Sequence, residues 1–466
     1  MGRGPGSGSG RTRPPRRQGL KRLGYTTAMP LKPSATGRYL VLLCPDKVRE
    51  GAKKLADTAQ IRVARHAGKR SRSGRSAALR DHCAVIFDHI GVALVRCTPD
   101  KQHLLANLAA ERDSAILAVE PERTVHASAS RRRVSIPTPV PGKAQAADVL
   151  QAYLQGYRDG IEDLSRRLPI MRDADSAASP RFDESAATWG VQAVGAHQSS
   201  HTGKNIRIAV LDTGLDLGHP DFSGRKIVTR SFIAGQTAQD DNGHGTHCAG
   251  IAAGPPHPSS GPRYGVAGDA ELYIGKVLGD EGSGGDGGVL EGIDWAIEHQ
   301  CQIISMSLGS PVQAGQAYSS IFEEVARPAL SAGTVIIAAA GNDSRRPGHI
   351  APVSHPANCP SIMAVAAVDQ AMQLAAFSSG GLLAEGGKVD IAAPGVDVLS
   401  SWPTPQLYNT ISGTSMATPF VAGAAALYAQ ADTNARGQEL LDTLLRRAAA
   451  LGLPERDTGA GLVQVP

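Results

Sequence analysis

The apolar positions of residues 37–127 alternate between continuous runs and helical spacing. The first run, 39–44, stops at Pro45, and a continuous run of this length indicates a strand buried on both faces. Further strands are expected at 84–87, 92–95 and 116–119. Two helices are expected from apolar residues at helical spacing, namely Val48, Ala52, Leu55, Ala59 and Val63, and then Leu104, Leu105 and Leu108 after the cap Thr98. Strand, helix, two strands, helix and strand is the ferredoxin-like order, which predicts a small α+β domain.

The pattern changes on both sides of this domain. Residues 1–36 combine Gly, Ser, Pro and Arg with almost no apolar run, which indicates a disordered basic tail. Residues 128–185 form a connector that begins with three consecutive Arg and a Pro-rich stretch. One amphipathic helix is expected in the connector at 149–168, from a single apolar stripe of Leu150, Tyr153, Leu154, Tyr157, Ile161, Leu164 and Leu168. The stripe gives this helix a packing role, and nothing in the sequence gives it another.

Residues 186–466 alternate apolar strands with helical segments, which is the pattern of a parallel sheet covered by helices. Strands are expected at 206–211, 272–277, 303–308, 335–340 and 362–368. The chain is therefore expected to be an α/β protein, in which a domain with a central, mostly parallel sheet follows the small ferredoxin-like domain. Its 466 residues, 41% of them hydrophobic, are enough for more than one domain with a buried core.

Composition and charge narrow the classes of function. The formal net charge is +5, and much of the basic excess lies in the tail, without the interleaved aromatic residues of a nucleic-acid-binding arm. The tail also lacks the apolar segment of a signal peptide, which is roughly 7–15 residues long. No uninterrupted run of about 18 apolar residues follows, so a membrane span is not expected. We therefore expect neither a nucleic acid nor a membrane as partner.

Six cysteines are spread along the chain without a Cys-x-x-Cys pair or a zinc pattern, at Cys44, Cys83, Cys97, Cys248, Cys301 and Cys359. Buried free thiols are the expectation from this spacing, and Cys248 in particular is expected to be a small buried hydrophobe. A disulfide between Cys301 and Cys359 stays open, because sequence alone does not decide pairing.

Two polar residues stand where a peptidase could hold a base and the acid that orients it. A base needs an acceptor on its far ring nitrogen, which fixes its tautomer and stabilises its charge. Asp212 directly follows the expected strand 206–211, at the strand end where open α/β sheets place their sites. His244 lies among small residues, which let a helix start close to the sheet and leave the imidazole accessible.

Two further residues suit a nucleophile and an oxyanion donor. Ser415 precedes Pro419, which fits the first turn of a helix, so the N–H of Ser415 is free to donate and the helix dipole favours an oxyanion. Asn342 follows the expected strand 335–340, and its amide can supply a second donor. Each signal is weak alone, but all four lie at an expected strand end or helix start.

Asp212, His244 and Ser415 follow the chain order Asp, His, Ser, which is the order of subtilisin, and Asn342 lies between the His and the Ser. Together they closely resemble the subtilisin-like serine peptidase (subtilase) family over nearly all of residues 186–466. The hallmark segments stand here as VLDTG (210–214), HGTHCAG (244–250), SMSLG (305–309), AAAGN (338–342) and GTSMATP (413–419). The resemblance implies a serine endopeptidase that works through an acyl-enzyme without a cofactor. In it Ser415 is the nucleophile, His244 the base, Asp212 the orienting acid and Asn342 the oxyanion donor, and His247 is structural.

The resemblance also implies how substrate binds and how the chain matures. Two segments look like the family's substrate-binding strands, which pair with a peptide backbone and wall the specificity pocket: Ser307, Leu308 and Gly309, and Ala339, Ala340 and Gly341. Residues 37–127 resemble the family's inhibitory propeptide, whose last strand stands here as 118–127. The chain is then a self-processing zymogen, cut between Ala127 and Ser185. Its expected partners are protein or peptide substrates and its own propeptide, and its expected state is a monomer.

Three departures from the family pattern bear on these expectations. Phe420 stands where many relatives have His, which implies a packing change behind Ser415. Residues 255–263 lack the Asn-containing turn that binds calcium in many relatives, although Asp221 matches the family's carboxylate ligand. Structural calcium at Asp221 is therefore allowed but not assured. A full propeptide usually accompanies secretion in the family, yet no signal peptide is visible, so the localisation stays open.

Two other functions fit parts of the sequence. Residues 212–214 and 457–459 are both Asp-Thr-Gly, the kind of pair with which an aspartic peptidase shares one proton. However, no buried strand is expected before Asp457. The other alternative is a catalytically inactive binding protein on a subtilase scaffold, which Phe420 keeps open.

Overall fold

The computed structural model describes residues 36–57, 60–64, 83–98, 101–111, 113–128, 182–381 and 387–466. The helix expected at 149–168 and nearly all of the expected tail at 1–36 lie outside the described residues. The described chain contains a five-stranded sheet near its N-terminal end and a seven-stranded sheet after it.

The five-stranded sheet has the order β2-β3-β4-β1-β5, from β1 (Arg38–Leu43), β2 (Arg62–Ala64), β3 (Cys83–Phe87), β4 (Val92–Arg96) and β5 (Ile116–Pro121). Its pairings are antiparallel except that of β2 with β3, which is parallel. Two helices connect its strands, α1 (Val48–Asp57) and α2 (Gln102–Ala110). The long strands and the two helices confirm the ferredoxin-like order, and β2 adds an edge strand.

Two details of the expected helices are wrong. Val63 belongs to β2 and not to the first helix, which ends at Asp57. The backbone leaves the helical region at Gln60, where φ is 51°, so the helical spacing of the apolar residues does not continue. Thr98 does not cap α2, because the N-cap is Lys101, whose N–H bonds to the carbonyl of Thr98 in a turn before the helix (3.0 Å).

The seven-stranded sheet has the order β15-β14-β13-β11-β7-β9-β8, and all its pairings are parallel. In chain order its strands are β7 (Arg207–Asp212), β8 (Ile227–Ser231), β9 (Glu271–Lys276), β11 (Ile303–Met306), β13 (Val335–Ala339), β14 (Met363–Val368) and β15 (Ile391–Pro394). Five of these confirm the expected strands. The two edge strands, β8 and β15, were not expected, because β8 carries Thr229 and Arg230 and β15 ends at Pro394, so neither is a long apolar run.

Helices cover both faces of this sheet, and the alternation along β7 shows how. Ile208 and Val210 share a hydrophobic cluster with α5 and α8, whereas Ala209 and Leu211 share one with α6 and α7. The helices of this domain are α4 (Trp189–Ala193), α5 (His244–Ala253), α6 (Asp286–Glu298), α7 (Ser320–Ser331), α8 (Thr414–Ala431), α9 (Gln438–Arg447) and α10 (Glu455–Thr458). Other elements of the described residues are the 3-10 turns η1 (Pro45–Lys47) and η4 (Pro220–Phe222), the hairpin of β16 (Val398–Ser401) and β17 (Tyr408–Ile411), and a three-stranded sheet of short strands.

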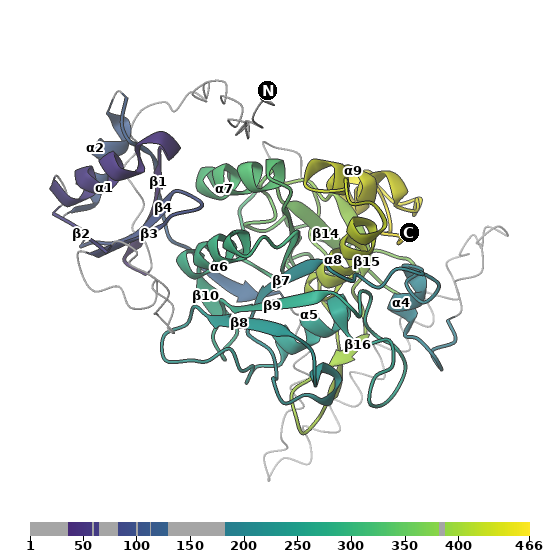
Figure 1. Cartoon of the computed structure of the whole chain (residues 1–466). Coiled ribbons are helices and arrows are strands. Elements are labelled where there is room, and N and C mark those ends of the chain that lie inside the picture. The colour runs from purple at the N-terminus through teal and green to yellow at the C-terminus, as the bar shows by residue number, and fades with distance from the viewer. Residues whose placement is uncertain are drawn as a thin grey trace, which may run out of the picture.

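The first sheet shares a core with the second domain. Its strand β1 is buried on both faces, as the continuous apolar run predicts. Tyr39, Val41 and Leu43 pack in one cluster with residues of α1 and α2. Leu40 and Leu42 point the other way and join the cluster that contains residues of α6 and α7. Figure 1 shows the small sheet lying against these two helices.

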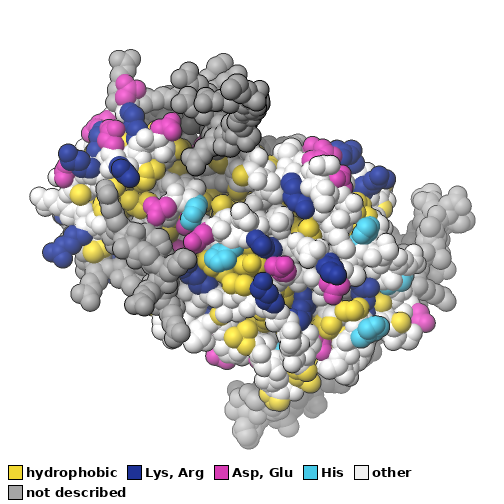
Figure 2. Space-filling view, in the orientation of Figure 1, with side chains coloured by type: hydrophobic (Ala, Val, Ile, Leu, Met, Phe, Trp, Pro, Cys, Tyr) yellow, Lys and Arg dark blue, Asp and Glu magenta, His cyan; other side chains and the backbone are white. Residues whose placement is uncertain are grey.

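Charged side chains of both signs lie on the face that Figure 2 shows. Lys and Arg side chains are interspersed there with Asp and Glu and do not gather in one basic patch. In the described part of the chain, none of the helices combines the length and the apolar character that crossing a membrane requires.

Candidate active site

Asp212 and His244 form a buried pair at the carboxyl end of the parallel sheet. Asp212 is the last residue of β7, and His244 is the first residue of α5. Nδ1 of His244 lies 2.7 Å from Oδ1 of Asp212, and the two side chains are only 3% and 1% exposed. Glycine makes this approach possible, because a Cβ on Gly245 would lie 2.3 Å from the carbonyl oxygen of Gly214. The pair fixes the imidazole with Nδ1 toward the carboxylate and Nε2 pointing away from it.

The charges around His244 suit a base. Burial by itself lowers the pKa of His244, but the Asp212 carboxylate outweighs burial and raises this pKa well above its ordinary value. Nε2 of His244 is buried and has no hydrogen-bond partner, so it is free to accept a proton. The neighbouring His247 differs, since burial and the His244 charge lower its pKa to about 3 and its Nε2 faces the carbonyls of Val398 and Asn409. His247 is therefore neutral and fixed in the interior.

Ser415 is the second residue of α8, and the helix starts earlier than its Pro suggested. We expected Pro419 in the first turn, but α8 begins at Thr414 after the cap Gly413, so Pro419 lies inside the helix. Because Pro419 has no N–H, the carbonyl of Ser415 four residues before it lacks its helical partner. The hydroxyl of Ser307 donates to that carbonyl instead (2.8 Å), and Oγ of Ser415 donates to the carbonyl of Ser307 (3.0 Å). Ser415 is thus held at a helix N-terminus, where its own N–H has no intrahelical acceptor.

Asn342 lies just beyond β13 and is oriented by the start of α8. Its Oδ1 accepts from the N–H of Thr414 (2.9 Å) and from the hydroxyl of Thr414 (3.0 Å). These two bonds aim the amide Nδ2 the other way, where it donates to the carbonyl oxygen of Ser128. Ser128 directly follows the small N-terminal domain, so a carbonyl of the chain itself occupies the position in front of Asn342.

A strand of the N-terminal domain lies beside these residues, between two short strands of the second domain, and we call the space between those two strands the groove. β6 (Thr124–Ala127) is the middle strand of a three-stranded sheet, between β10 (Ser283–Gly285) and β12 (Leu308–Gly309). Both of its pairings are antiparallel, with Ala127 opposite Leu308 and Gly284 opposite Val125. Beyond β6, the N–H of Ser128 donates to the carbonyl of Ser307 (3.2 Å), the same carbonyl that accepts from the Ser415 hydroxyl.

Of the two expected substrate-binding strands, one bonds to the docked strand and the other does not among the described contacts. Ser307, Leu308 and Gly309 bond to the docked strand and its extension, as the resemblance implied. Residues 339–341 do not bond to it among the described contacts, because their polar backbone groups pair elsewhere, as when Ala340 accepts from Ser354 (2.9 Å). They form a buried wall, and the second strand beside the peptide is β10, which our sequence analysis missed. The Gly-rich run 282–285 before a helix was the signal that pointed to it.

Comparison with known proteins agrees with this geometry. The sequence profile described as the Subtilase family matches residues 203–462. Subtilisin Savinase of Lederbergia lenta is 40% identical over 279 residues, which cover 59% of this chain and 96% of Savinase. Subtilisin E of Bacillus subtilis (strain 168) is 40% identical over 264 residues, covering 56% of this chain and 65% of Subtilisin E.

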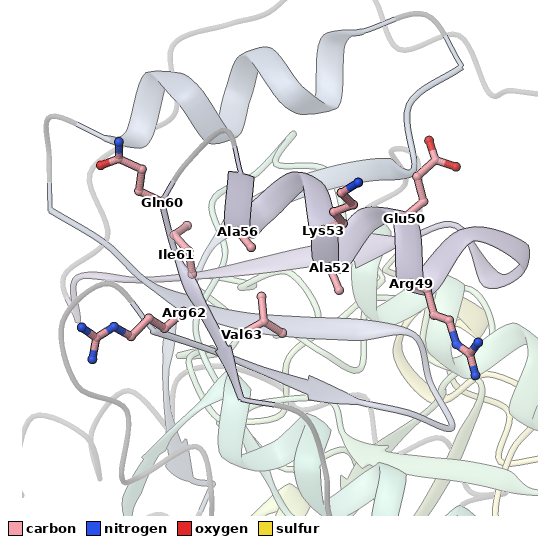
Figure 3. Close-up of a pocket in the computed structure, with 9 residues that line it drawn as sticks. All are labelled: Arg49, Glu50, Ala52, Lys53, Ala56, Gln60, Ile61, Arg62 and Val63. Atoms are coloured by element: carbon pink, nitrogen blue, oxygen red, sulfur yellow. The ribbon is translucent and has the colours of Figure 1, made fainter.

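The chain belongs to the subtilase family. It is a subtilisin-like serine endopeptidase, and members of this family need no cofactor for catalysis. The family match begins at residue 203, so the five-stranded sheet lies outside it. A pocket of that domain is lined by residues of α1, β2 and the segment just before β2 (Figure 3), and its lining does not include Asp212, His244 or Ser415.

Asp221 of this subtilase does not fit a calcium ion. Its carboxylate already accepts from the N–H of Ser259 (2.7 Å) and from the hydroxyls of Tyr264 (2.7 Å) and Tyr408 (3.0 Å). Burial would raise the pKa of Asp221, but these donors outweigh burial and lower it. Ca²⁺ needs about six to eight oxygen ligands with their lone pairs free, whereas three hydrogens point at this carboxylate. The donor set therefore disagrees with the expectation that Asp221 binds calcium.

Phe420 packs without disturbing the catalytic residues. Its ring is fully buried and lies over Gly190 of α4, where a Cβ would come within 2.4 Å of the ring. A glycine on one helix thus makes room for the aromatic ring on the other. Asp457, the second carboxylate of the aspartic-peptidase alternative, pairs with Arg346 (2.6 Å), while Asp212 pairs with His244, so the two carboxylates do not share a proton.

All six cysteines are free thiols, and Cys301 and Cys359 do not pair. Four of them are buried as expected, whereas Cys44 and Cys83 are only partly buried. Cys248 lies beside the catalytic pair, with Sγ 3.8 Å from Nδ1 of His244 and 3.5 Å from the carbonyl of Ser415. Asp212, His244 and Cys248 could in principle surround a metal ion, but Nδ1 of His244 is already bonded to Asp212. Burial raises the pKa of the Cys248 thiol, so it stays protonated and acts as a small packed side chain.

Proposed function

We propose that this subtilase is made as a self-inhibited precursor that cuts its own chain directly after Ser128. In this proposal residues 37–127 are the inhibitory propeptide and residues 186–466 the peptidase. The observation that carries the proposal is the bond from Nδ2 of Asn342 to the carbonyl of Ser128, at the end of a strand that fills the groove. All groups involved belong to one chain, so the proposed cut needs no second copy of the chain.

The proposed scissile carbonyl lies beside the nucleophile. The N–H of Ser128 and the hydroxyl of Ser415 both donate to the carbonyl oxygen of Ser307, at 3.2 Å and 3.0 Å. Two donors to one oxygen must themselves lie close together. In this proposal, a side-chain rotation turns the Ser415 hydroxyl from Ser307 toward the Ser128 carbonyl and Nε2 of His244.

The chemistry then follows from groups already in position. Oγ of Ser415 attacks the carbonyl carbon of Ser128 as Nε2 of His244 takes the hydroxyl proton, and the Asp212 carboxylate stabilises the imidazolium. The oxyanion accepts from Nδ2 of Asn342 and from the N–H of Ser415 at the start of α8. His244 gives its proton to the leaving amine, and the acyl-enzyme on Ser415 is hydrolysed by water with His244 again as base. A peptide bond is broken, one water is consumed, and the enzyme is regenerated.

Two carboxylates of the proposed propeptide dock it on helix N-termini. Oε1 of Glu122 accepts from the N–H of Gly287 in the first turn of α6 (3.0 Å), and Arg38 pairs with the other oxygen (2.6 Å). Glu120 accepts from the hydroxyls of Ser319 and Ser320 at the start of α7 (2.7 Å each). Negative charge at a helix N-terminus is favourable, and Glu122 is almost fully buried. These contacts hold the five-stranded sheet over α6 and α7 and keep β6 in the groove.

Substrates of the mature enzyme are proposed to bind as β6 does. An extended segment of a protein adds a strand between β10 and β12, which gives affinity through backbone bonds without fixing the sequence. Val125, four residues from the cut end with Ser128 counted first, is fully buried in the apolar cluster shared with α6 and α7. An apolar residue at that position is therefore favoured in substrates.

The test is expression of the full chain beside its Ser415→Ala variant. Wild type should yield a catalytic fragment, and the variant should stay at 48.4 kDa. Ser331→Ala, an equal change on the exposed side of α7, is the control and should process like wild type.

Two results would overturn the proposal. Equal cleavage of Ser415→Ala in a protease-deficient host would mean that another enzyme processes the chain. An intact wild type that a serine-directed fluorophosphonate probe fails to label would favour the inactive binding protein instead.

A further inference from the structure

Arg123 occupies the far end of the groove, five residues before Ser128. It lies in the turn between β5 and β6, and its backbone is held by a single residue at the start of α6. The N–H of Arg123 donates to Oδ2 of Asp286 (3.0 Å), and its carbonyl accepts from the N–H of Asp286 (3.1 Å). These two bonds fix the register of the sixth residue before the cut whatever its side chain is.

The side chain of Arg123 makes a separate contact with a buried imidazole. Its guanidinium nitrogen lies 2.9 Å from Nδ1 of His355, and Nε2 of His355 lies 3.0 Å from Oδ1 of Asp286. A guanidinium has only donors, so Nδ1 must be the acceptor. His355 is then a neutral imidazole that carries its proton on Nε2 and donates it to Asp286. The tautomer follows from the partners, and it leaves one acceptor directed at the end of the groove.

The pair is rigidly built and is not used in the chemistry. Asp286 and His355 are 1% and 0% exposed. The imidazole meets the ring of Phe322 edge-on at 4.6 Å, and its backbone pairs in both directions with Ser310 (2.8 and 3.0 Å). A buried carboxylate and imidazole are costly unless their polar atoms have partners. When the propeptide leaves, Nδ1 of His355 and Oδ2 of Asp286 lose the partners that Arg123 supplies.

Once the propeptide has left, Asp286 is the carboxylate that remains bonded to His355 at this place. Glu120 lies 3.8 Å from the guanidinium of Arg123, but Glu120 belongs to the propeptide and departs with it. The remaining lining offers one carboxylate and one imidazole acceptor, and no cation of the peptidase bonds to either in the described contacts. A substrate side chain that brings positive charge and hydrogen-bond donors satisfies both.

We propose that Asp286 and His355 form a subsite that selects Arg, and more weakly Lys, at the sixth residue before the scissile bond. This inference rests on the proposed function, because it takes the docked strand as a guide to how substrates bind. Arg is favoured over Lys because its planar group presents several donors in a fixed arrangement. Asp286 bonds to the backbone of the sixth residue and supplies the negative charge, and His355 accepts a hydrogen bond from its side chain.

The experiment uses processed wild type and fluorogenic peptides with the sequence of residues 123–130, in which the first residue is Arg, Lys, Ala or Glu. We expect kcat/KM to be about tenfold higher for Arg than for Ala, mainly through KM, because a hydrogen bond to a charged group is worth about that much. Glu should be the poorest substrate, because its charge repels Asp286.

Variants localise the effect. Asp286→Asn and His355→Gln should bring the Arg-to-Ala ratio close to one, while the rate on the Ala peptide shows whether each variant is still folded and active. Glu298→Gln, at the exposed other end of α6, removes the same charge without touching the subsite and should keep the full ratio.

The outcomes separate the subsite from the activity itself. Equal rates on the Arg and Ala peptides with wild type would overturn the subsite and leave the proteolysis intact. An Arg preference that survives in both subsite variants would mean that other residues make the selection. Failure of processed wild type to cleave any of the peptides would instead count against the proposed function.

Discussion

Two buried carboxylate–imidazole pairs lie along one groove, and they differ in which ring nitrogen meets the acid. In the pair of Asp212 and His244, Nδ1 faces the carboxylate at 2.7 Å. In the pair of Asp286 and His355, Nε2 faces it at 3.0 Å. Both acids are buried, and both imidazoles are held in one orientation by their acid. The same two side-chain types can therefore have different functions, depending on which group faces the second ring nitrogen.

The group that faces the second ring nitrogen determines which function each imidazole can have. Nε2 of His244 has no hydrogen-bond partner among the described residues, and in the proposed function it takes up the proton of the Ser415 hydroxyl. Nδ1 of His355 faces the guanidinium of Arg123, which never gives up its proton, so this nitrogen only accepts a hydrogen bond. A buried acid–histidine pair therefore indicates a general base only where a transferable proton is within reach.

The largest expected effect comes from the same substitution made in each pair. Asp212→Asn should lower kcat by about 10⁴-fold, because an amide no longer fixes the productive tautomer or stabilises the imidazolium. Asp286→Asn should leave kcat nearly unchanged and raise KM most for substrates with Arg at the sixth position, because the backbone bond to Asp286 is shared by all substrates. Steady-state kinetics of both processed variants on the Arg and Ala peptides is the measurement. Similar losses of kcat in the two variants would erase the distinction between the pairs.

The next effect concerns the oxyanion. Asn342→Leu should lower kcat by about 10²–10³-fold with little change in KM, which is the range known for loss of the corresponding donor in subtilisin. The bonds from Thr414 to Oδ1 of Asn342 orient the amide, so Thr414→Val should cause a smaller loss of the same kind. An effect of Asn342→Leu confined to KM would mean that the residue binds substrate in the ground state only.

On the acid side of the pH profile, kcat/KM is expected to rise tenfold per pH unit. His244 must be neutral to act as base, and the Asp212 carboxylate raises its pKa, so His244 stays protonated to a higher pH. The rise of kcat/KM should therefore have its midpoint above the ordinary value of 6.5 and level off in the alkaline range. Residual activity of Asp212→Asn should rise at lower pH, since the charge that raises the pKa is gone. A wild-type midpoint below 6.5 would contradict this.

The smallest expected effect is that of calcium. Three donors occupy the Asp221 carboxylate, so excess chelator should leave the melting temperature unchanged through this site. Tyr408→Phe should instead lower the free energy of unfolding by about 1 kcal/mol with or without chelator, because one hydrogen bond to the carboxylate is lost. A melting temperature that falls on chelation in wild type but not in Asp221→Asn would restore calcium to the site.

Sequence patterns predict the parts of the site that lie at ends of regular elements. Asp212 and Asn342 follow apolar strands, and His244 starts a helix among glycines, so periodicity alone brings out their positions. The start of α8 was harder to predict from the sequence, because Pro419 lies inside the helix. Ser307 supplies the replacement partner for the carbonyl of Ser415 that this proline requires. That partner is remote in the chain, and local patterns do not reveal it.

The groove end could not be predicted, for the same reason. Asp286 and His355 belong to no motif and meet only when α6 and the loop after β13 pack together. β10 was missed because its residues, Ser283–Gly285, are too small to show an alternating pattern, yet the lack of a side chain at Gly285 is what makes room for the docked domain. A Cβ on Gly285 would lie 2.5 Å from Glu122, so the missing side chain is a feature of docking. Long-range packing, and not local propensity, determines this part of the site.

The most direct test of the account is the C-terminal residue of the fragment first released from the wild-type chain. Tandem mass spectrometry of that fragment, sampled early in processing, avoids confusion with later trimming of the catalytic part. We predict that it ends at Ser128, whose carbonyl faces Asn342, and that Ser415→Ala releases no such fragment. A first fragment that ends at any other residue, with the bond after Ser128 still intact, would contradict the account.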